Sequence, residues 1–220
     1  MLIEQPSCFL RMLYPQAIWR MDPSKREVYL TFDDGPIPRV TTWTLDLLDK
    51  YDIKATFFMV GDNVRKHPEE YQDVVRRGHA IGNHTFHHLR GFQVQVEEYS
   101  QDIALAGEYM STKLFRPPHG FMTPKQYAYV KQHFRLIMWD LVTRDYSKRL
   151  TGKQVFRNVQ RYVRNGSIIT FHDSLKAESK LHYALPRSIE WLLEQGYTFH
   201  KFTEDACLQG NANDRPTIIL

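Results

Sequence analysis

The residues of this chain with the clearest chemical potential are two adjacent carboxylates and a group of histidines. Asp33 and Asp34 stand where an apolar stretch ends at a Gly-Pro turn, and His84 and His88 lie four residues apart. One carboxylate with two such histidines is an O,N,N ligand set for a divalent metal, with one coordination position left open for water. The other carboxylate is then free to act as a base on that water. The pattern predicts a metal-assisted hydrolase.

Each of these motifs also has an ordinary explanation. Asp-Asp-Gly-Pro alone is a common turn sequence, in which Asp caps the backbone. A lone histidine is more often a surface or core residue than a ligand, but His84, His87 and His88 gather directly after a predicted strand. If a helical turn begins there, the i,i+4 spacing places His84 and His88 on one face. His87 would point away from that face, and we assign it no role.

The composition fits one globular domain. The chain has 220 residues, of which 42% are hydrophobic, and we expect a single catalytic domain over residues 1–220 with its motifs in 27–203. No apolar stretch has the length of a transmembrane helix. The N-terminus lacks the basic region and apolar run of a signal peptide, which favours a cytoplasmic location by default.

The charge does not indicate a nucleic-acid-binding protein, and the cysteine spacing does not indicate a metal or redox motif. The net charge of +4 comes from 29 basic and 25 acidic side chains without a basic run, so nucleic acid is not an expected partner. Cys8 and Cys207 lie far apart and outside any C-x-x-C spacing, and we expect buried or half-buried free thiols. The sequence does not indicate an oligomeric state.

Strands and helices are predicted to alternate along the chain. The expected strands are 27–32, 55–60, 80–83, 114–115, 134–139, 167–171 and 197–202. The expected helices are 43–51, 68–77, 94–110, 124–133, 153–163 and one that contains 189–195. This alternation predicts an α/β architecture with about seven parallel strands.

The candidate functional residues share one end of these strands. Those at or just after a predicted C-terminal strand end are Asp33, Asp34, His84, Arg116, Asp145 and His172. Barrel enzymes build their active sites at that end, whereas scattered polar residues would fall at both ends. We therefore expect these side chains to form one site.

Two of the motifs carry a family resemblance. Thr31-Phe32-Asp33-Asp34-Gly35-Pro36 and His84-Thr85-x-x-His88 resemble the first two motifs of the polysaccharide deacetylases, the NodB-homology carbohydrate esterases, and the resemblance spans roughly 28–202. It implies a distorted (β/α) barrel and removal of acetyl groups from N-acetylated sugars. The implied partner is an acetylated glycan or oligosaccharide: peptidoglycan, a chitin-like chain or a surface polysaccharide. Such a substrate suggests the cell envelope.

The resemblance assigns the two carboxylates different roles. Asp33 resembles the catalytic base, and Asp34 resembles a metal ligand together with His84 and His88. The implied cofactor is a divalent metal. This ligand set suits Zn²⁺ best, and Co²⁺, Ni²⁺ and Fe²⁺ also fit it.

Three further motifs supply the remaining implied roles. Arg116 resembles the arginine that holds the base, and the backbone N–H of His119 resembles the donor that meets the oxyanion. His172 resembles the general acid, and Asp145 resembles the aspartate that orients it. Such an acid would protonate the leaving amine, and the aspartate would stabilise the imidazolium.

Four positions depart from the family pattern. His119 replaces the usual tyrosine or tryptophan, and we expect it in the groove wall rather than as a ligand. Tyr146 replaces tryptophan in the wall of the acetyl pocket, and Val142 stands where a further acid is common. Thr170 replaces the leucine that lies against the acetate methyl, which predicts a more polar pocket. His119, Tyr146 and Thr170 are thus expected to contact the substrate.

Two other functions are compatible with these residues. The altered walls would suit a metal-dependent hydrolase of another amide or of an O-acetyl ester. A non-catalytic glycan-binding protein on the same fold is the second alternative. Retention of both Asp33 and His172 argues against it, since a binding protein needs neither a base nor an acid.

Overall fold

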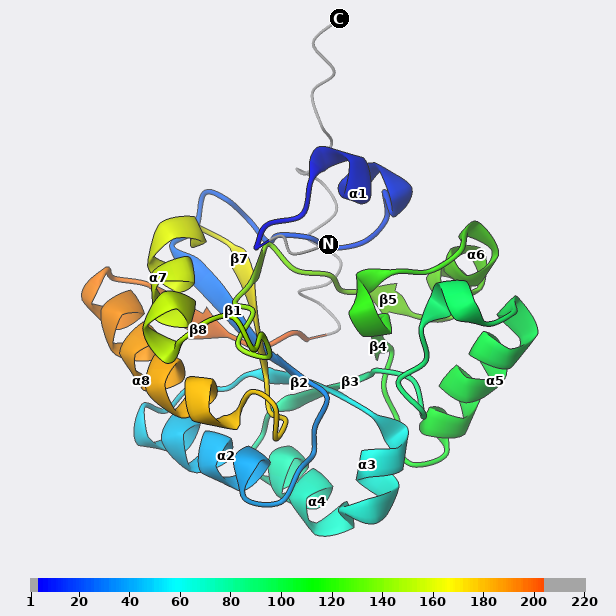
Figure 1. Ribbon diagram of the computed structural model, residues 1–220, viewed down its shortest axis with the longest axis horizontal. Coiled ribbons are helices and arrows are strands. Elements are labelled where there is room, and N and C mark those ends of the chain that lie inside the picture. Colours follow the sequence, from blue (N-terminus) through cyan, green and yellow to red (C-terminus); the bar gives the residue numbers. More distant parts are fainter. Residues whose placement is uncertain (1–3, 204–220) are drawn as a thin grey trace, which may run out of the picture.

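The computed structural model describes residues 4–203 and contains a curled, open sheet of parallel strands (Figure 1). The strands are β1 (Glu27–Asp33), β2 (Thr56–Met59), β3 (Ala80–Asn83), β4 (Leu114–Phe115), β5 (Arg135–Leu136), β6 (Leu141–Val142), β7 (Ser167–His172) and β8 (Thr198–His200). Their order is β5-β4-β3-β2-β1-β7-β6, and β8 also pairs with β1. The predicted α/β fold, a distorted barrel with about seven parallel strands, is confirmed.

Strand β1 lies at the centre of the sheet. Its first half, Glu27–Tyr29, pairs with β8, and its second half, Thr31–Asp33, pairs with β2. Strand β7 runs along the whole of its other side, so that Asp33 is in register with His172. The end of β1 is therefore flanked on both sides by paired strands, which hold Asp33 in a fixed position.

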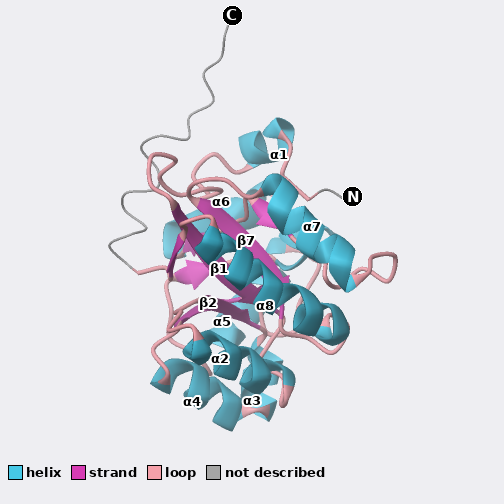
Figure 2. Cartoon of the chain, turned by 90° about the vertical axis from the view of Figure 1, so that its left-hand side faces the viewer, coloured by secondary structure: helices cyan, strands magenta, loops and turns pink. Residues whose placement is uncertain are grey.

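Helices cover the outside of the sheet. They are α1 (Cys8–Leu13), α2 (Val40–Lys50), α3 (Gly61–Lys66), α4 (Pro68–Arg76), α5 (Val96–Gly107), α6 (Pro124–His133), α7 (Gly152–Tyr162) and α8 (Glu178–Glu194), with 3₁₀ turns at Gly91–Gln93 and Pro118–Gly120. Figure 2 shows α7 and α8 packed over β1 and β7. Within residues 4–203, no helix combines the length and the apolar character needed to cross a membrane.

The alternation of side chains along β1 and β7 separates the core from the site. Outward residues pack under the helices: Val28, Leu30, Phe32, Ile169 and Phe171. Inward residues begin with an apolar layer that includes Tyr29 and Ile168. Because successive residues face opposite sides of a strand, the next inward residues are Thr31 and Thr170, followed by Asp33 and His172. The inward face thus becomes more polar toward the C-terminal strand ends.

An N-terminal segment, residues 4–21, bridges the two edges of the open sheet. Next to β5, Ile18 donates its N–H to the Leu136 carbonyl and accepts the N–H of Met138. Next to β6, the Glu4 carbonyl accepts the N–H of Val142. These bonds satisfy backbone groups that an open sheet edge would leave unpaired.

The predicted strand 134–139 is mostly wrong, because regular pairing ends at Leu136. The carbonyl oxygens of Ile137 and Met138 instead accept hydrogen bonds from the Arg116 guanidinium, at 3.2 and 2.8 Å. A carbonyl that serves a side chain in this way interrupts the ladder between strands. The interruption is therefore tied to the position of a candidate site residue.

Several elements escaped prediction from the sequence. Helices α1 and α3 and the two-residue strand β6 are additional, and α8 begins well before residue 189. The expectation of a buried or half-buried Cys8 is wrong: this thiol is free and exposed, because it lies on the solvent side of the short helix α1. Cys207 lies outside the described residues.

Candidate active site

The turn after β1 is tightly fixed. Asp34 adopts a positive φ of 82°, and its carbonyl accepts a hydrogen bond from the Asn63 side chain at 2.7 Å. The N–H of Gly35 donates to Asp173 at 3.1 Å, and a Cβ on Gly35 would lie 2.1 Å from that carboxylate. Only glycine fits here. Burial, together with the charge of Asp34, raises the pKa of Asp173 to about 8 although Thr41 donates to it.

His84 and His88 converge on Asp34, but not through a helical turn. The expected turn is wrong, since Thr85 and His88 both adopt positive φ, at 61° and 56°. Side chains bind the backbone there instead: Asn83 accepts the N–H of Thr85, and Asp102 accepts those of Phe86 and His87. Positive φ at non-glycine residues is costly, and such residues gather at functional sites.

The three predicted ligands are close enough to share one cation. One ligand atom each from Asp34, His84 and His88 lies within 4.8 Å of the others. Asp34 Oδ1 is 3.8 Å from His84 Nε2 and 3.2 Å from His88 Nε2. His84 Nδ1 lies 2.7 Å from the Arg116 carbonyl, which fixes the ring with Nε2 toward Asp34.

Electrostatics at this cluster favour metal ligation. Burial lowers the pKa of His84 to about 4, so its imidazole is neutral at pH 7, as a ligand must be. Burial would raise the pKa of Asp34, but the neighbouring histidines, beginning with the hydrogen bond from His88, lower it well below its usual range. One carboxylate oxygen and two imidazole nitrogens are a fitting donor set for a divalent transition metal.

The second carboxylate has a different partner. Asp33 Oδ1 accepts a 2.6 Å hydrogen bond from Arg116 Nη1, and both side chains are buried. Among the described residues, Asp33 Oδ2 accepts no hydrogen bond. One oxygen is thus held by a cation, while the other keeps its lone pairs for a proton.

His172 lies beside Asp33, its register partner on the neighbouring strand β7. Its Nδ1 is 2.8 Å from Asp145 Oδ1, and its backbone N–H donates to Asp145 Oδ2 at 2.7 Å. Tyr146 meets the His172 ring edge-on, with centroids 4.8 Å apart. Burial opposes a charge on His172, but attraction to Asp145, with smaller contributions from Asp34 and Asp33, raises its pKa to about 9. His172 Nε2 can therefore carry a proton at neutral pH.

The loop that carries Asp145 is supported from the N-terminal segment. Arg144 adopts a positive φ of 63° and forms an ion pair with Glu4. The backbone of Glu4 binds the same region, since its carbonyl accepts the N–H of Val142.

His119 borders the three predicted ligands without joining them. Its ring lies edge-on to His88 with centroids 4.7 Å apart, and its φ is 59°. Burial, with the neighbouring charges of His88 and Arg90, lowers its pKa to about 4. Within residues 4–203, its backbone N–H makes no hydrogen bond. This group remains open to a ligand.

Thr170, which the sequence predicts to contact the substrate, lies deep in the barrel interior. It is 2% exposed, and its hydroxyl is 3.1 Å from the Thr31 hydroxyl and 3.2 Å from Arg116 Nη1. Its hydroxyl therefore belongs to the network beneath Asp33.

Some participants were missed by the sequence analysis, namely Thr31 as a partner of Arg116, Asp173 and the Glu4–Arg144 pair. For Thr31 and Asp173, the sequence contains a signal that could have identified them. Thr31 precedes Asp33 by two residues and so shares its face of the strand, and Asp173 directly follows His172. Nothing in the sequence connects Glu4 with Arg144, because 139 residues separate them.

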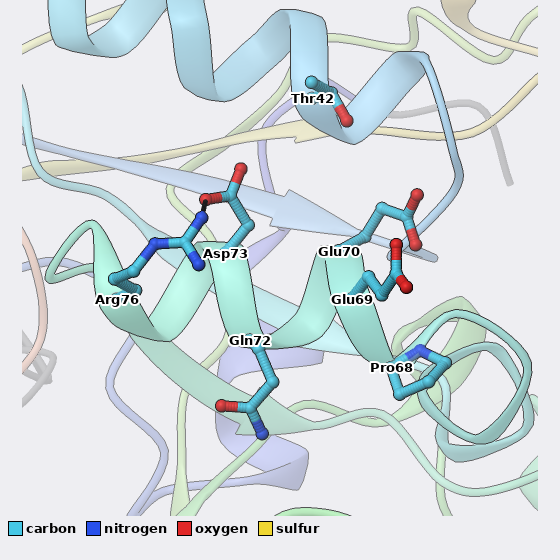
Figure 3. Close-up of a pocket in the computed structure, with 7 residues that line it drawn as sticks. All are labelled: Thr42, Pro68, Glu69, Glu70, Gln72, Asp73 and Arg76. Carbon is cyan, nitrogen blue, oxygen red and sulfur yellow. Dashed lines mark hydrogen bonds and ion pairs between the residues drawn. The ribbon is translucent and has the colours of Figure 1, made fainter.

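A surface cleft elsewhere on the molecule contains none of the predicted site residues. It lies between α2 and α4, and it is lined by Thr42, Pro68, Glu69, Glu70, Gln72, Asp73 and Arg76 (Figure 3). Its Asp73 and Arg76 pair with each other. The chemistry described above gathers instead at the C-terminal ends of the strands.

Comparison with known protein families identifies similar sequences. A family described as polysaccharide deacetylase matches residues 20–134. A peptidoglycan-N-acetylglucosamine deacetylase of Bacillus cereus is 32% identical over 84% of this chain and 91% of its own length. The peptidoglycan-N-acetylmuramic acid deacetylase PdaC of Bacillus subtilis is 31% identical over 80% of this chain and 38% of its length.

Comparison with solved structures also identifies a peptidoglycan deacetylase. The Bc1960 peptidoglycan N-acetylglucosamine deacetylase superposes with a TM-score of 0.81 at 30% identity, over 90% of this chain and 95% of its own. BA3943 of Bacillus anthracis, described as a CE4 family pseudoenzyme, gives a TM-score of 0.79 at 27% identity, over 91% and 72%. Likeness in fold therefore includes a protein without the activity, and the site residues must carry the functional argument.

Proposed function

The chain belongs to the polysaccharide deacetylase family, and we propose that it is a metal-dependent hydrolase that removes acetyl groups from N-acetylated sugars of a glycan. The observation that carries this proposal is the pair of adjacent aspartates with divided roles. Asp34 faces His84 and His88, whereas Asp33 faces Arg116. A binding protein would have no use for this division.

Asp34, His84 and His88 would hold the cation, for which we propose Zn²⁺ because one oxygen and two nitrogen ligands suit it. When bound, such a cation supplies Lewis-acid polarisation of the acetyl carbonyl and of a water molecule. Asp34 and His88 both have positive φ, a costly backbone conformation that gathers at functional sites, and this supports their assignment as ligands.

Asp33 would act as the general base. Its Oδ2 is unengaged, so it can accept a proton from the attacking water, while Arg116 fixes the carboxylate through Oδ1. The free backbone N–H of His119 would donate to the developing oxyanion. Its imidazole and the ring of Tyr146 would form opposite walls of the substrate groove.

His172 would act as the general acid. Hydrolysis of an amide requires protonation of the leaving nitrogen, and the proton on His172 Nε2 is the available one. Asp145 holds the ring through Nδ1 and stabilises its charged form. Asp33 and His172 are adjacent in strand register, so base and acid stand on neighbouring strands at the same level.

We propose peptidoglycan as the glycan and its N-acetylglucosamine residue as the acetylated sugar. The names of the Bacillus cereus relative and of the Bc1960 structure support this choice over chitin-like chains and other polysaccharides. The likeness to that relative extends over 91% of its length.

Acetate release from peptidoglycan and from N-acetylglucosamine oligomers tests this proposal. The assay compares protein stripped of metal by a chelator, the same protein reloaded with Zn²⁺ or Co²⁺, and a His172→Ala variant that is loaded in the same way. We expect release that requires metal and is lost in the variant. Metal bound at one ion per chain without any acetate release would reject the deacetylase assignment and direct the search to other amides and esters.

A further inference from the structure

The hydroxyl of Thr170 is part of the support beneath the candidate base. We infer that Thr170 is a positioning residue that sets the orientation of Asp33 through Arg116, rather than a residue that contacts the acyl group. This inference rests on the proposed function of Asp33, and it concerns a network of five described residues in the barrel interior: Thr31, Asp33, Phe58, Arg116 and Thr170.

Most of the Arg116 guanidinium is anchored without Thr170. Its Nε and Nη2 donate to main-chain carbonyls at 3.2 and 2.8 Å, and its flat face lies 4.0 Å above the Phe58 ring. These contacts fix the plane of the group. The remaining nitrogen, Nη1, is the one that reaches Asp33, and its environment decides how firmly the carboxylate is held.

Three oxygens surround Nη1, which carries only two hydrogens. They are Asp33 Oδ1 at 2.6 Å, Thr31 Oγ1 at 2.8 Å and Thr170 Oγ1 at 3.2 Å. The two hydroxyls lie side by side because Thr31 and Thr170 are paired in register on β1 and β7. Together the two hydroxyls give Nη1 two oxygen neighbours in addition to the Asp33 carboxylate.

The directions of the hydrogen bonds follow from the partners at hand. Thr31 Oγ1 lies 3.0 Å from the Ile169 carbonyl, which can only accept. If Thr31 donates there, Thr170 donates to Thr31, and both hydroxyl hydrogens are used. In the reverse arrangement the Thr170 hydrogen would lack an acceptor among the described residues. Thr170 thus begins a chain of hydrogen bonds that fixes both hydroxyls and leaves their lone pairs facing Arg116.

Burial makes each of these bonds important. Arg116 is 1% exposed, so bulk water does not reach its guanidinium to replace a lost acceptor. Without the Thr170 hydroxyl, Nη1 loses one oxygen and Thr31 loses its donor, and the guanidinium can shift relative to Asp33. A small displacement of a base from its water is costly in rate, because the reacting groups must be correctly placed.

The test compares Thr170→Val, which keeps the shape and removes the hydroxyl, with Thr170→Ser, which keeps the hydroxyl. We expect Thr170→Val to lower kcat about tenfold at unchanged KM, since hydrogen bonds to charged groups are worth that much or more. Thr170→Ser should restore the wild-type kcat. The matched control is Thr44→Val, which removes a buried hydroxyl that bonds only within α2. It should leave kcat unchanged.

Other outcomes would overturn the inference. A rise in KM with unchanged kcat, together with an altered preference between N-acetyl and N-propionyl sugars, would place Thr170 in contact with the acyl group. Equal losses in Thr170→Val and Thr170→Ser would indicate a packing role. Crystal structures of the two variants supply a readout that does not depend on activity, since only Thr170→Val should displace Arg116 Nη1 from Asp33. If the wild-type protein released no acetate, the proposed function would fail, while these structures would still decide the positioning role.

Discussion

Asp33 and Asp140 are both buried and both paired with arginine, but they differ in how many of their oxygen lone pairs accept hydrogen bonds. Asp140 lies between β5 and β6, and all its bonding capacity is used: Oδ1 accepts from Arg11 and Arg164, and Oδ2 accepts from Arg164 and Ser167. Asp33 lies at the end of β1 and accepts from Arg116 through Oδ1 alone.

The positions of the arginines reinforce the difference. Arg11 and Arg164 reach Asp140 from the surface, with side chains 22% and 45% exposed, and they tie α1 and the loop before β7 to the barrel. Arg116 is enclosed in the barrel interior, with its side chain 1% exposed, and pairs with a carboxylate that is 8% exposed. A carboxylate with every lone pair engaged stabilises a fold, whereas one held by a single oxygen remains available for chemistry.

Asp33→Asn tests the second half of this comparison and should have the largest effect on activity. The amide can keep its contact with Arg116 through its oxygen, but its nitrogen cannot accept a proton. We expect kcat for metal-dependent acetate release to fall about a thousandfold, within the range for loss of a general base. Metal content, measured by mass spectrometry, should stay at the wild-type level because Asp34, His84 and His88 are intact. Unchanged hydrolysis would remove Asp33 from the mechanism.

Asp140→Asn tests the first half and should act on stability instead. We expect the free energy of unfolding in urea to fall by about 2 kcal/mol, since the amide nitrogen of Asn cannot accept the hydrogen bonds that Arg164 and Ser167 donate to Oδ2. The kcat of the folded protein should not change. If Asp33→Asn and Asp140→Asn lost activity and stability equally, the two carboxylates would not differ in function.

The stabilisation by Asp140 should also depend on pH. Burial raises the pKa of this carboxyl, but Arg164, Ser167 and Arg11 outweigh burial and lower it below its usual range. A lowered folded-state pKa gives stability that is present above the unfolded pKa and is lost as the pH falls through the folded pKa. The stability difference between wild type and Asp140→Asn should therefore narrow in acid.

Asp145→Asn should have the smallest of these effects and changes the pH profile rather than abolishing activity. The proposed mechanism requires protonated His172, whose pKa is raised to about 9, mainly by Asp145 acting against burial. Removing that charge lowers the pKa, so the alkaline limb of kcat should move to lower pH and kcat at neutral pH should fall about tenfold. A bound cation opposes the charge on His172 in both proteins, so they are compared in the metal-loaded state. An alkaline limb at the same pH in both would exclude His172 as the titrating acid.

Much of the fold could be predicted because it depends on local patterns. The pattern of apolar residues located β1, β3 and β7 to within a residue or two, and the helix expected at 124–133 is α6 with the same bounds. The prediction was poorest for the strand expected at 134–139, which ends early because its carbonyls bind Arg116. That interruption depends on a residue about twenty positions away and leaves no trace in local composition.

The candidate site divides in the same way. The sequence by itself determined which residues stand at the C-terminal strand ends, and so the gathering of Asp33, Asp34, His84, Arg116, Asp145 and His172, because strand polarity is common to all parallel strands. It did not determine how His84 and His88 converge, because Asn83 and Asp102 replace the expected helical turn with side-chain hydrogen bonds.

Only the tertiary structure determined which side chains Thr170 and Arg144 contact. Sequence places Thr170 two residues before His172, but its partner Thr31 is 139 residues distant and meets it through the register of β1 and β7. Glu4 and Arg144 meet because the N-terminal segment crosses the sheet opening. Local periodicity fixes the face on which a side chain lies, whereas register and chain crossing fix which side chain it meets there.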